Sequence, residues 1–251
     1  MSHPYKQFYR RKLPHIQPPN ATFFVTFRLA GSIPRSVLDQ RKEEKVWLQT
    51  EIDRVSKIAD NTTLKVDQQQ RARLLDFHRR WFVKFEEILH KEETGPVWMK
   101  DPRIADLIQD SFHYRDGKVF RLDSYSIMSN HVHTVFKPFL NEQSLHVVAG
   151  SNPLMYETVD PTLAVIMKSL KGYTAHEANR ILNRRGTFWE AESYDHFVRN
   201  DAEYDRIVKY VLNNPVNAGL VEELVWLEVE LASYDRLLAC RRGVFARRDT
   251  S

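Results

Sequence analysis

The sequence has one cysteine, no long apolar run and little excess charge, and each scarcity excludes a class of protein. The single Cys240 cannot form an internal disulfide or a multi-cysteine zinc site. No apolar run approaches the length of a membrane-spanning helix. The basic, aromatic segment 1–20 lacks the apolar core of a signal peptide. We therefore expect a soluble, intracellular protein in the cytoplasm.

The composition is that of a folded domain. The chain has 251 residues, of which 42% are hydrophobic and five are Trp, so it can bury a core. This length suits one large domain, or one domain with an insertion. Lys and Arg number 37 against 33 acidic residues, a net charge of +4. This mild basic excess is compatible with a nucleic-acid partner but does not require one.

Three segments have the pattern of strands. Apolar and polar residues alternate along 22–30, and 118–128 and 131–138 flank the short turn Ser129–Asn130. Because asparagine tolerates left-handed geometry, we expect it there in the turn. A further extended stretch is expected within 187–199.

Helical patterns fill much of the remaining chain. Residues 36–93 are charged and glycine-free, which predicts an inserted helical hairpin. A helix is expected over 101–114, with Asp101 as N-cap and Pro102 in its first turn. The others are a helix over 161–185 that breaks near Gly172 and restarts with Thr174 and Glu177, a helix from Asn200 that stops at Pro215, and a C-terminal amphipathic stretch over 222–240 with a basic tail.

The stretch "HVH" places two histidines on one face of a strand. His131 and His133 are two residues apart, so their imidazoles point the same way, a spacing that suits a divalent metal. Short motifs of this kind also arise by chance. The alternative is a pair of core or hairpin histidines that bind nothing.

Tyr210 and Asn214 lie four residues apart in a predicted helix and therefore share one face. The pair could place a phenolic nucleophile beside a third metal ligand, or it could belong to a half-buried apolar stripe. Tyr173 and Tyr194 compete for the nucleophile's role, but neither has an asparagine four residues later.

Five stretches follow one another along the chain: "YRRKLPHIQPPNATFFVTFRLAGSIP", "DSYSIMSNHVHTVFKP", "IMKSLKGYTAHEANRI", "GTFWEAESYDHFVRN" and "YDRIVKYVLNNPVNAGLV". In this order they resemble the REP-associated tyrosine transposases, which are single-tyrosine transposases of the HUH superfamily and similar to the IS200 type. The sequence departs from the family pattern at Ser129, where proline is usual, and at Glu190, where glutamine is usual. The 36–93 segment is longer than in compact members.

The resemblance implies an α+β fold: a ferredoxin-like antiparallel sheet with packed helices, plus the inserted hairpin. The catalytic core would be 1–35 with 94–221, the hairpin insertion 36–93, and the C-terminal helix and basic tail 222–251. His131, His133 and Asn214 would bind Mg²⁺ or Mn²⁺. Tyr210 would attack single-stranded DNA, giving a 5′-phosphotyrosine and a free 3′-OH.

The implied partner is single-stranded or hairpin DNA of the REP type, and the protein would associate with the bacterial nucleoid, as a monomer or a homodimer. We expect the DNA contacts at basic side chains of the N-terminal segment and of the 161–185 helix: Arg10, Arg11, His15, Lys168, Lys171 and Arg180. His196 is expected either to form a structural hydrogen bond or to orient a ligand.

Three alternatives remain open at the level of sequence. One is a related HUH endonuclease that nicks DNA or initiates replication. Another is a catalytically silent DNA-binding protein derived from a transposase. The third is a metal-dependent phosphohydrolase, in which Tyr210 has no role and no covalent adduct forms.

Overall fold

The structure is a computed structural model, and it describes residues 8–10, 14–16, 20–58, 63–139, 163–218 and 242–245. The chain divides into two compact units. One is Gly31–Pro96, and the other combines Met1–Ala30 with Val97–Ser251. Among the described residues, no helix is both long enough and apolar enough to cross a membrane.

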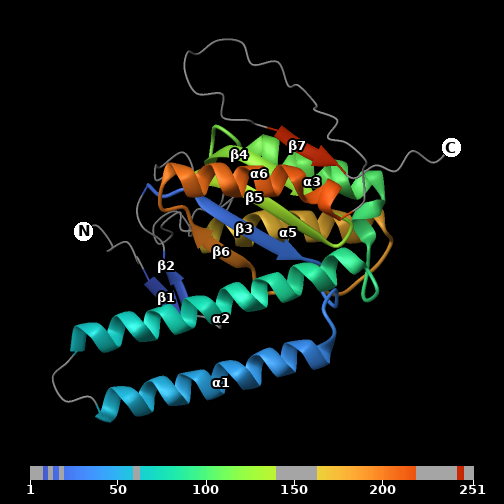
Figure 1. The fold of residues 1–251 in the computed structure, drawn as a ribbon. Coiled ribbons are helices and arrows are strands. Elements are labelled where there is room, and N and C mark those ends of the chain that lie inside the picture. Colours follow the sequence, from blue (N-terminus) through green and yellow to red (C-terminus); the bar gives the residue numbers. More distant parts are fainter. Residues whose placement is uncertain are drawn as a thin grey trace, which may run out of the picture. The chain divides into compact units, whose positions relative to one another are not determined.

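The larger unit is built on a five-stranded sheet (Figure 1). Its strands are β3 (Phe23–Arg28), β4 (Phe120–Ile127), β5 (His131–Pro138), β6 (Tyr194–Phe197) and β7 (Arg242–Phe245). Their order is β6-β3-β5-β4-β7. The first four are antiparallel to their neighbours, and β7 runs parallel to β4.

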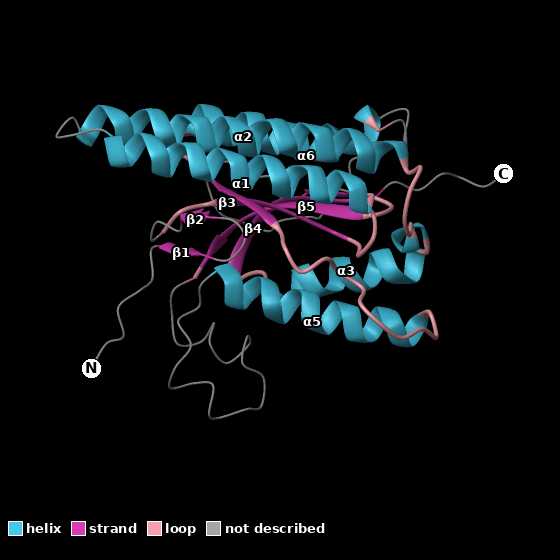
Figure 2. Cartoon of the chain, turned by 90° about the horizontal axis from the view of Figure 1, so that it is seen from below, coloured by secondary structure: helices cyan, strands magenta, loops and turns pink. Residues whose placement is uncertain are grey.

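Helices cover both faces of this sheet. They are α3 (Pro102–Arg115), α5 (Leu163–Ile181) and α6 (Asp201–Asn217), with a short 3-10 turn, η1 (Trp98–Lys100). Helices α3 and α5 lie on one face and α6 lies on the other (Figure 2). The succession β3-α3-β4-β5-α5-β6 with the order β6-β3-β5-β4 is the ferredoxin-like arrangement. The predicted α+β class is confirmed.

The main hydrophobic core fills the space between the sheet and the helices α3 and α5. Because side chains alternate along a strand, Val25 and Phe27 of β3 and Val132 of β5 point into it. They pack with Ile108 of α3 and Ile166 of α5. The two histidines of β5, at alternate positions to Val132, point to the other face.

The predicted N-caps of two helices are confirmed. Asp101 caps α3, and its carboxylate accepts the Arg103 N–H at 3.0 Å, with Pro102 in the first turn. Asn200 caps α6, and its side-chain oxygen accepts the Glu203 N–H at 2.9 Å. In both cases a side-chain oxygen satisfies a backbone donor that the first helical turn leaves over.

The predicted break in the 161–185 helix is wrong, because α5 runs continuously past Gly172. The Thr174 hydroxyl donates to the Leu170 carbonyl one turn earlier at 2.8 Å, and it accepts the indole N–H of Trp189 at 2.9 Å. Thr174 is thus a buried link in the middle of the helix. It is not the cap of a new one.

Two further expectations fail for local reasons. Helix α6 continues through Pro215 to Asn217, so Pro215 lies in its last turn, where few helical residues remain to be disturbed. Asn130 does not have a positive φ; among the described residues other than glycine, only Asn20, Glu92 and Asn183 do. The side chain of Asn130 contacts the imidazole of His131.

Three strands were not expected from the sequence. Residues Phe8–Arg10 and Pro14–Ile16 form the antiparallel pair β1 and β2. Strand β7 lies within the basic tail. The expected amphipathic stretch over 222–240 lies outside the described residues.

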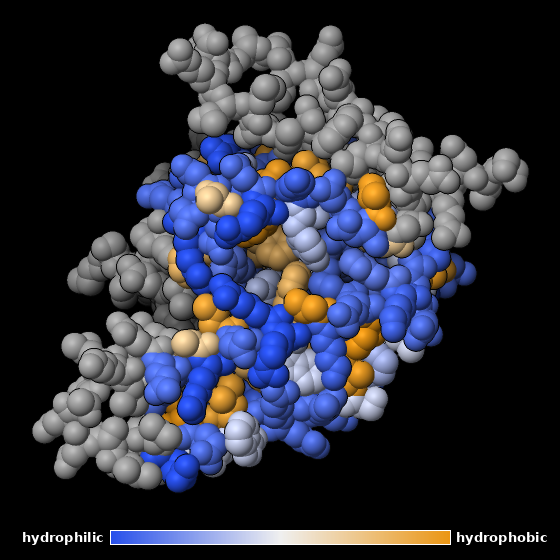
Figure 3. Space-filling view, in the orientation of Figure 1, coloured by the Kyte–Doolittle hydropathy of each residue, from blue (hydrophilic) through white to orange (hydrophobic). Residues whose placement is uncertain are grey.

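The smaller unit, Gly31–Pro96, contains two helices, α1 (Arg35–Ile58) and α2 (Thr63–Lys91). Its core gathers buried residues of both helices: Leu48, Ile52, Phe77 and Trp81. The Trp81 indole also donates to the Glu44 carboxylate at 2.9 Å. Val46, Trp47 and Val83 remain exposed, and Figure 3 shows hydrophobic patches among hydrophilic surface in this part of the chain.

Gly95, near the end of the smaller unit, packs against the backbone at the beginning of that unit. Its φ is +79°, and a Cβ there would overlap the backbone of Gly31 and Ser32. Gly117, with a φ of +75°, has open space around the same position. Both glycines therefore have a positive φ, but only Gly95 also lies so close to other backbone that a Cβ has no room.

We predict that Gly95→Ala lowers the free energy of unfolding more than Gly117→Ala. Each substitution places a Cβ in the left-handed region, at about 1–2 kcal/mol, and Gly95→Ala adds a clash with backbone that cannot rotate away. Urea unfolding followed by circular dichroism measures both. Equal losses would contradict the close approach of Gly95 to Gly31.

Candidate active site

His131 and His133 lie on β5, which runs between β3 and β4, and both side chains are buried. Val132 between them points into the core with α3 and α5, so the two imidazoles point to the face that α6 covers. Their ring centroids are 4.7 Å apart, with the planes at 81°. A ring nitrogen of one lies within 4.8 Å of a ring nitrogen of the other.

The Nδ1 atom of each imidazole is held by a neighbouring side chain. The side-chain oxygen of Asn130 lies 2.7 Å from Nδ1 of His131. The hydroxyl of Thr26, directly opposite on β3, lies 2.8 Å from Nδ1 of His133. Each ring is therefore held at one nitrogen, and coordination of a metal would use the other, Nε2.

Tyr210 of α6 lies over this pair. Its ring centroid is 5.5 Å from that of His133 and 6.0 Å from that of Phe24. Phe24 in turn stacks on His133 at 5.8 Å, with the planes at 19°. The predicted nucleophile Tyr210 and the predicted ligand His133 are thus brought together, although they lie 77 positions apart in the sequence.

Asn214 follows Tyr210 by about one helical turn, and its side chain is completely buried. The face of α6 that carries Tyr210 and Asn214 is therefore turned inward. Since α6 packs against β4 and β5, the carboxamide lies on the sheet side of its helix.

The two imidazoles form a donor set that could hold a divalent metal ion. Two neutral imidazoles presented through Nε2 are common ligands for such ions. Two imidazoles and one carboxamide would leave positions open around such an ion for phosphate and water. The hydrogen bonds at Nδ1 fit this use, because metal-bound histidines nearly always donate their other ring N–H to an oxygen.

The two competing tyrosines occupy different places. Tyr173 lies on α5, on the opposite face of the sheet, and 51% of its surface is exposed. Tyr194 lies on β6 opposite Thr26, and its ring meets Phe24 at 6.1 Å. Tyr194 therefore lies on the same face of the sheet as His133, and it is the structural competitor of Tyr210.

An ion pair borders the two histidines. Arg28 is the register partner of His131 on β3, and its guanidinium lies 3.2 Å from the Glu190 carboxylate. Burial lowers the pKa of Arg28, and the neighbouring Glu190 opposes that shift. Glutamate at position 190, where the resembled family has glutamine, thus balances a cation buried beside the site.

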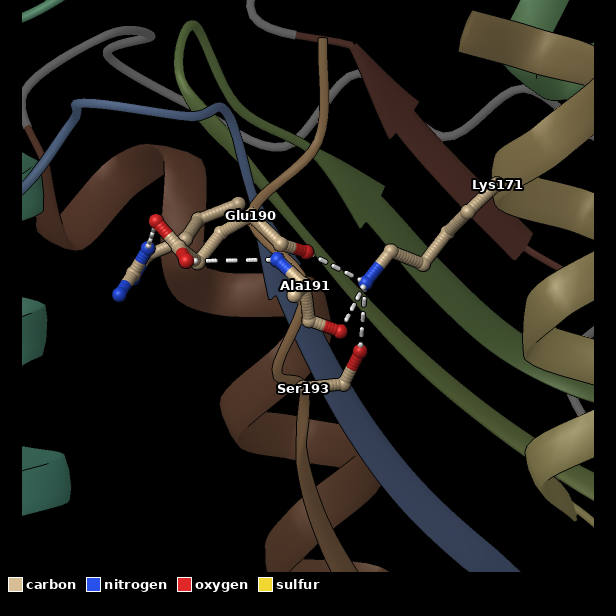
Figure 4. Close-up of polar contacts among 5 residues, drawn as sticks. Lys171, Glu190, Ala191 and Ser193 are labelled. Atoms are coloured by element: carbon tan, nitrogen blue, oxygen red, sulfur yellow. Dashed lines mark hydrogen bonds and ion pairs between the residues drawn. The ribbon is translucent and has the colours of Figure 1, made fainter. Parts of the chain in front are cut away.

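Lys171 holds the segment that carries Glu190. Its ammonium donates to the Glu190 carbonyl at 2.6 Å, the Ala191 carbonyl at 3.1 Å and the Ser193 hydroxyl at 3.2 Å (Figure 4). Figure 4 shows all three acceptors turned toward the one ammonium group. The predicted role of Lys171 in phosphate contact stays a prediction, and the contacts here are structural.

The other predicted DNA contacts are spread over the chain. Lys168 and Arg180 are exposed on α5, the helix on the sheet face opposite Tyr210, and Arg180 pairs with Glu177 at 2.9 Å. Arg10 lies in β1 and His15 lies in β2. Arg11 lies outside the described residues. Their role in DNA contact stays a prediction.

His196, left open between two roles, forms a hydrogen bond. Its Nε2 lies 3.0 Å from a carboxylate oxygen of Glu203 in the first turn of α6, and the other oxygen accepts the Arg199 N–H at 2.9 Å. Burial opposes ionisation of Glu203, but the Arg199 N–H and His196 together outweigh burial and hold its pKa below the ordinary value. The contact ties β6 to the start of the helix that carries Tyr210.

Thr26, Arg28 and Phe24 belong to this site but were not singled out in the sequence. Strand alternation places all three on one face of 22–30, and this signal was available. What the sequence lacked was the pairing of β3 with β5, which sets Thr26 against His133 and Arg28 against His131.

Comparisons with known proteins add little. The sequence matches no protein-family model and no curated protein. One solved structure is similar, a REP-associated tyrosine transposase bound to a REP hairpin, at 15% sequence identity and a TM-score of 0.39 over 89% of this chain and 78% of that one.

We predict that Glu203→Gln destabilises the protein at neutral pH and that the difference from wild type narrows in acid. The unfolded carboxyl has its ordinary pKa near 4.5, and the folded one lies lower. The stabilisation is therefore full above that value and is lost as the pH falls through the folded pKa. Urea unfolding from about pH 7 down to about pH 3 measures it.

The control for this experiment is Asp205→Asn, which removes an exposed carboxylate of the same helix. It should change the stability little at any pH in the series. A Glu203→Gln deficit that stays constant across the series would show that the contact does not depend on the charge of Glu203.

Proposed function

We propose that this protein is a metal-dependent enzyme that cleaves and rejoins single-stranded DNA through a 5′-phosphotyrosine intermediate, as the HUH tyrosine transposases do. The observation that carries the proposal is the placement of the Tyr210 ring 5.5 Å from the ring of His133. That contact joins the two separate motifs, "HVH" and the tyrosine–asparagine helix, in one place.

The proposed metal ligands are His131, His133 and Asn214, and the ion is Mg²⁺ or Mn²⁺. When bound there, it would supply Lewis-acid stabilisation of the charge that develops on a phosphate. The fold places the proposed ligands: β5 carries the two imidazoles, and the inward face of α6 carries the carboxamide.

Tyr210 is proposed to attack the phosphorus of a DNA phosphodiester. A bond forms between the phenolic oxygen and phosphorus, and the bond from phosphorus to the 3′ oxygen breaks. The phenol loses its proton to solvent and the 3′ oxygen gains one, which leaves a 3′-OH. Attack by a different 3′-OH reverses these steps and joins a new strand, so no nucleotide cofactor is needed.

Tyr210 is favoured over Tyr194 by its neighbours. Both rings contact Phe24, but only Tyr210 also contacts His133, and only Tyr210 has a buried asparagine one turn later. A nucleophile must lie within reach of the group that polarises its target. Tyr194 therefore serves as a matched control, since it lies on the same face of the same sheet.

The proposed substrate is hairpin DNA of the REP type, which rests on the sequence resemblance. The proposed contacts of Lys168 and Arg180 would lie on the sheet face opposite Tyr210, so DNA bound there would be stem or flank, away from the cleaved bond. Arg10, Arg11, His15 and Lys171 are the other proposed contacts. Phosphate contacts of this kind would weaken with rising salt.

We predict that wild-type protein with Mn²⁺ and 3′-labelled single-stranded DNA, carrying a hairpin from the flanks of its own gene, gives a labelled covalent adduct on a denaturing gel. The adduct should vanish with Tyr210→Phe, with His131→Ala and with excess chelator, because each removes the nucleophile or the ion. Tyr194→Phe should retain it.

Other outcomes identify the alternatives. Cleavage that persists in Tyr210→Phe without an adduct would point to a metal-dependent phosphohydrolase. Binding of several flanking hairpins with neither cleavage nor adduct would indicate a catalytically silent DNA-binding protein. Nicking without transfer to a second 3′-OH would favour a nicking or replication-initiation enzyme.

A further inference from the structure

Two side chains that are not proposed as metal ligands contact the paired imidazoles. Asn130 and Thr26 are both buried, with exposed fractions of 0% and 7%, and each reaches the Nδ1 atom of one histidine. They come from different segments, since Asn130 lies in the turn before β5 and Thr26 lies in the middle of β3. The two rings thus receive the same kind of contact from independent sources.

The contact at His131 determines which nitrogen carries the proton. The side-chain oxygen of Asn130 can only accept a hydrogen bond, so Nδ1 of His131 must donate it. A neutral imidazole has one N–H. Its second nitrogen, Nε2, therefore carries the lone pair that a metal ion needs.

The contact at His133 can take the same form. A threonine hydroxyl both donates and accepts, and it lies 2.8 Å from Nδ1. If the hydroxyl accepts, the Nδ1–H is fixed and Nε2 carries the lone pair, as in His131. If it donates, the proton of His133 lies on Nε2, and that nitrogen cannot coordinate.

The backbone around Asn130 is anchored, so its side chain starts from a fixed position. The Asn130 carbonyl accepts the Leu29 N–H at 2.8 Å, and the Ser129 carbonyl accepts the Met99 N–H at 3.2 Å. Thr26 is fixed by its place in β3, directly opposite His133. Both oxygens are therefore held in place by the fold before any ion binds.

We propose that Asn130 and Thr26 are positioning residues that hold His131 and His133 in the Nδ1–H tautomer, so that both present Nε2 to one divalent cation. The inference rests on the metal site of the proposed function and deepens it. It assigns two residues, one on each flanking segment, whose loss impairs the ion's binding without removing a ligand.

The first test measures the tautomers without any metal. In a long-range ¹H–¹⁵N spectrum of the protein, His131 and His133 should each show the Nδ1–H pattern. His131 should lose it in Asn130→Ala, and His133 should lose it in Thr26→Val. An Nε2–H pattern for either histidine in the wild-type protein would overturn the proposal.

The second test measures Mn²⁺ binding by calorimetry in the full chain. Loss of a residue that orients a metal-ligating histidine typically weakens binding by about 10–100-fold, and we expect this for Asn130→Ala and Thr26→Val. Thr26→Ser and Asn130→Asp keep an oxygen at the same place and should recover most of the affinity. Circular dichroism and thermal unfolding of each variant establish that it is folded.

Thr134→Val is the matched control for Thr26→Val. Thr134 is also a buried threonine of the central sheet, but it lies next to His133 on β5 and so points to the other face. It should leave Mn²⁺ binding unchanged.

The two proposals fail in different ways. If wild-type protein does not bind Mn²⁺, or binds it equally well after His131→Ala, the metal site is wrong and both proposals fall. If binding requires both histidines but is unchanged in folded Asn130→Ala and Thr26→Val, only the positioning role is overturned.

Discussion

The candidate site depends on the position of β5 between β3 and β4. A strand paired on both sides has its backbone fixed along its length, so its side chains can only point up or down. In β5 the imidazoles of His131 and His133 point toward α6, and Val132 and Phe136 point toward α3 and α5. The register with β3 then adds Thr26 and Arg28 opposite the two histidines. A shift of one residue would reverse all of these contacts.

The sequence predicted the parts of this arrangement that depend on local periodicity. The strand from His131 to Pro138, the caps at Asp101 and Asn200, and the shared face of Tyr210 and Asn214 all follow from patterns of two or of about four residues. The α+β class followed from the resemblance and from these elements together. Each of these signals lies within a few residues of the feature it predicts.

The parts that the sequence did not predict depend on contacts between distant segments. Thr174 was expected to start a helix because threonine and a later glutamate form a common capping pattern. In the fold its hydroxyl serves the helix carbonyl before it and the indole of Trp189. Asn130 lies in the turn where it was expected, but without a positive φ, and its side chain contacts His131. The layer in which α5 lies also depends on topology, so its place on the sheet face opposite α6 could not be predicted from the basic side chains that it carries.

The alternation of side chains along β5 has a consequence for which substitutions the fold can accept. Along β5, Val132 and Phe136 pack in the main core, whereas His131 and His133 lie on the side of α6. Substitutions at alternate positions of one strand thus act on different parts of the molecule, the main core in one set and the buried imidazole pair in the other. A lineage could replace both imidazoles and keep the core contacts of β5, so very few mutations separate this pair of histidines from a folded domain without it.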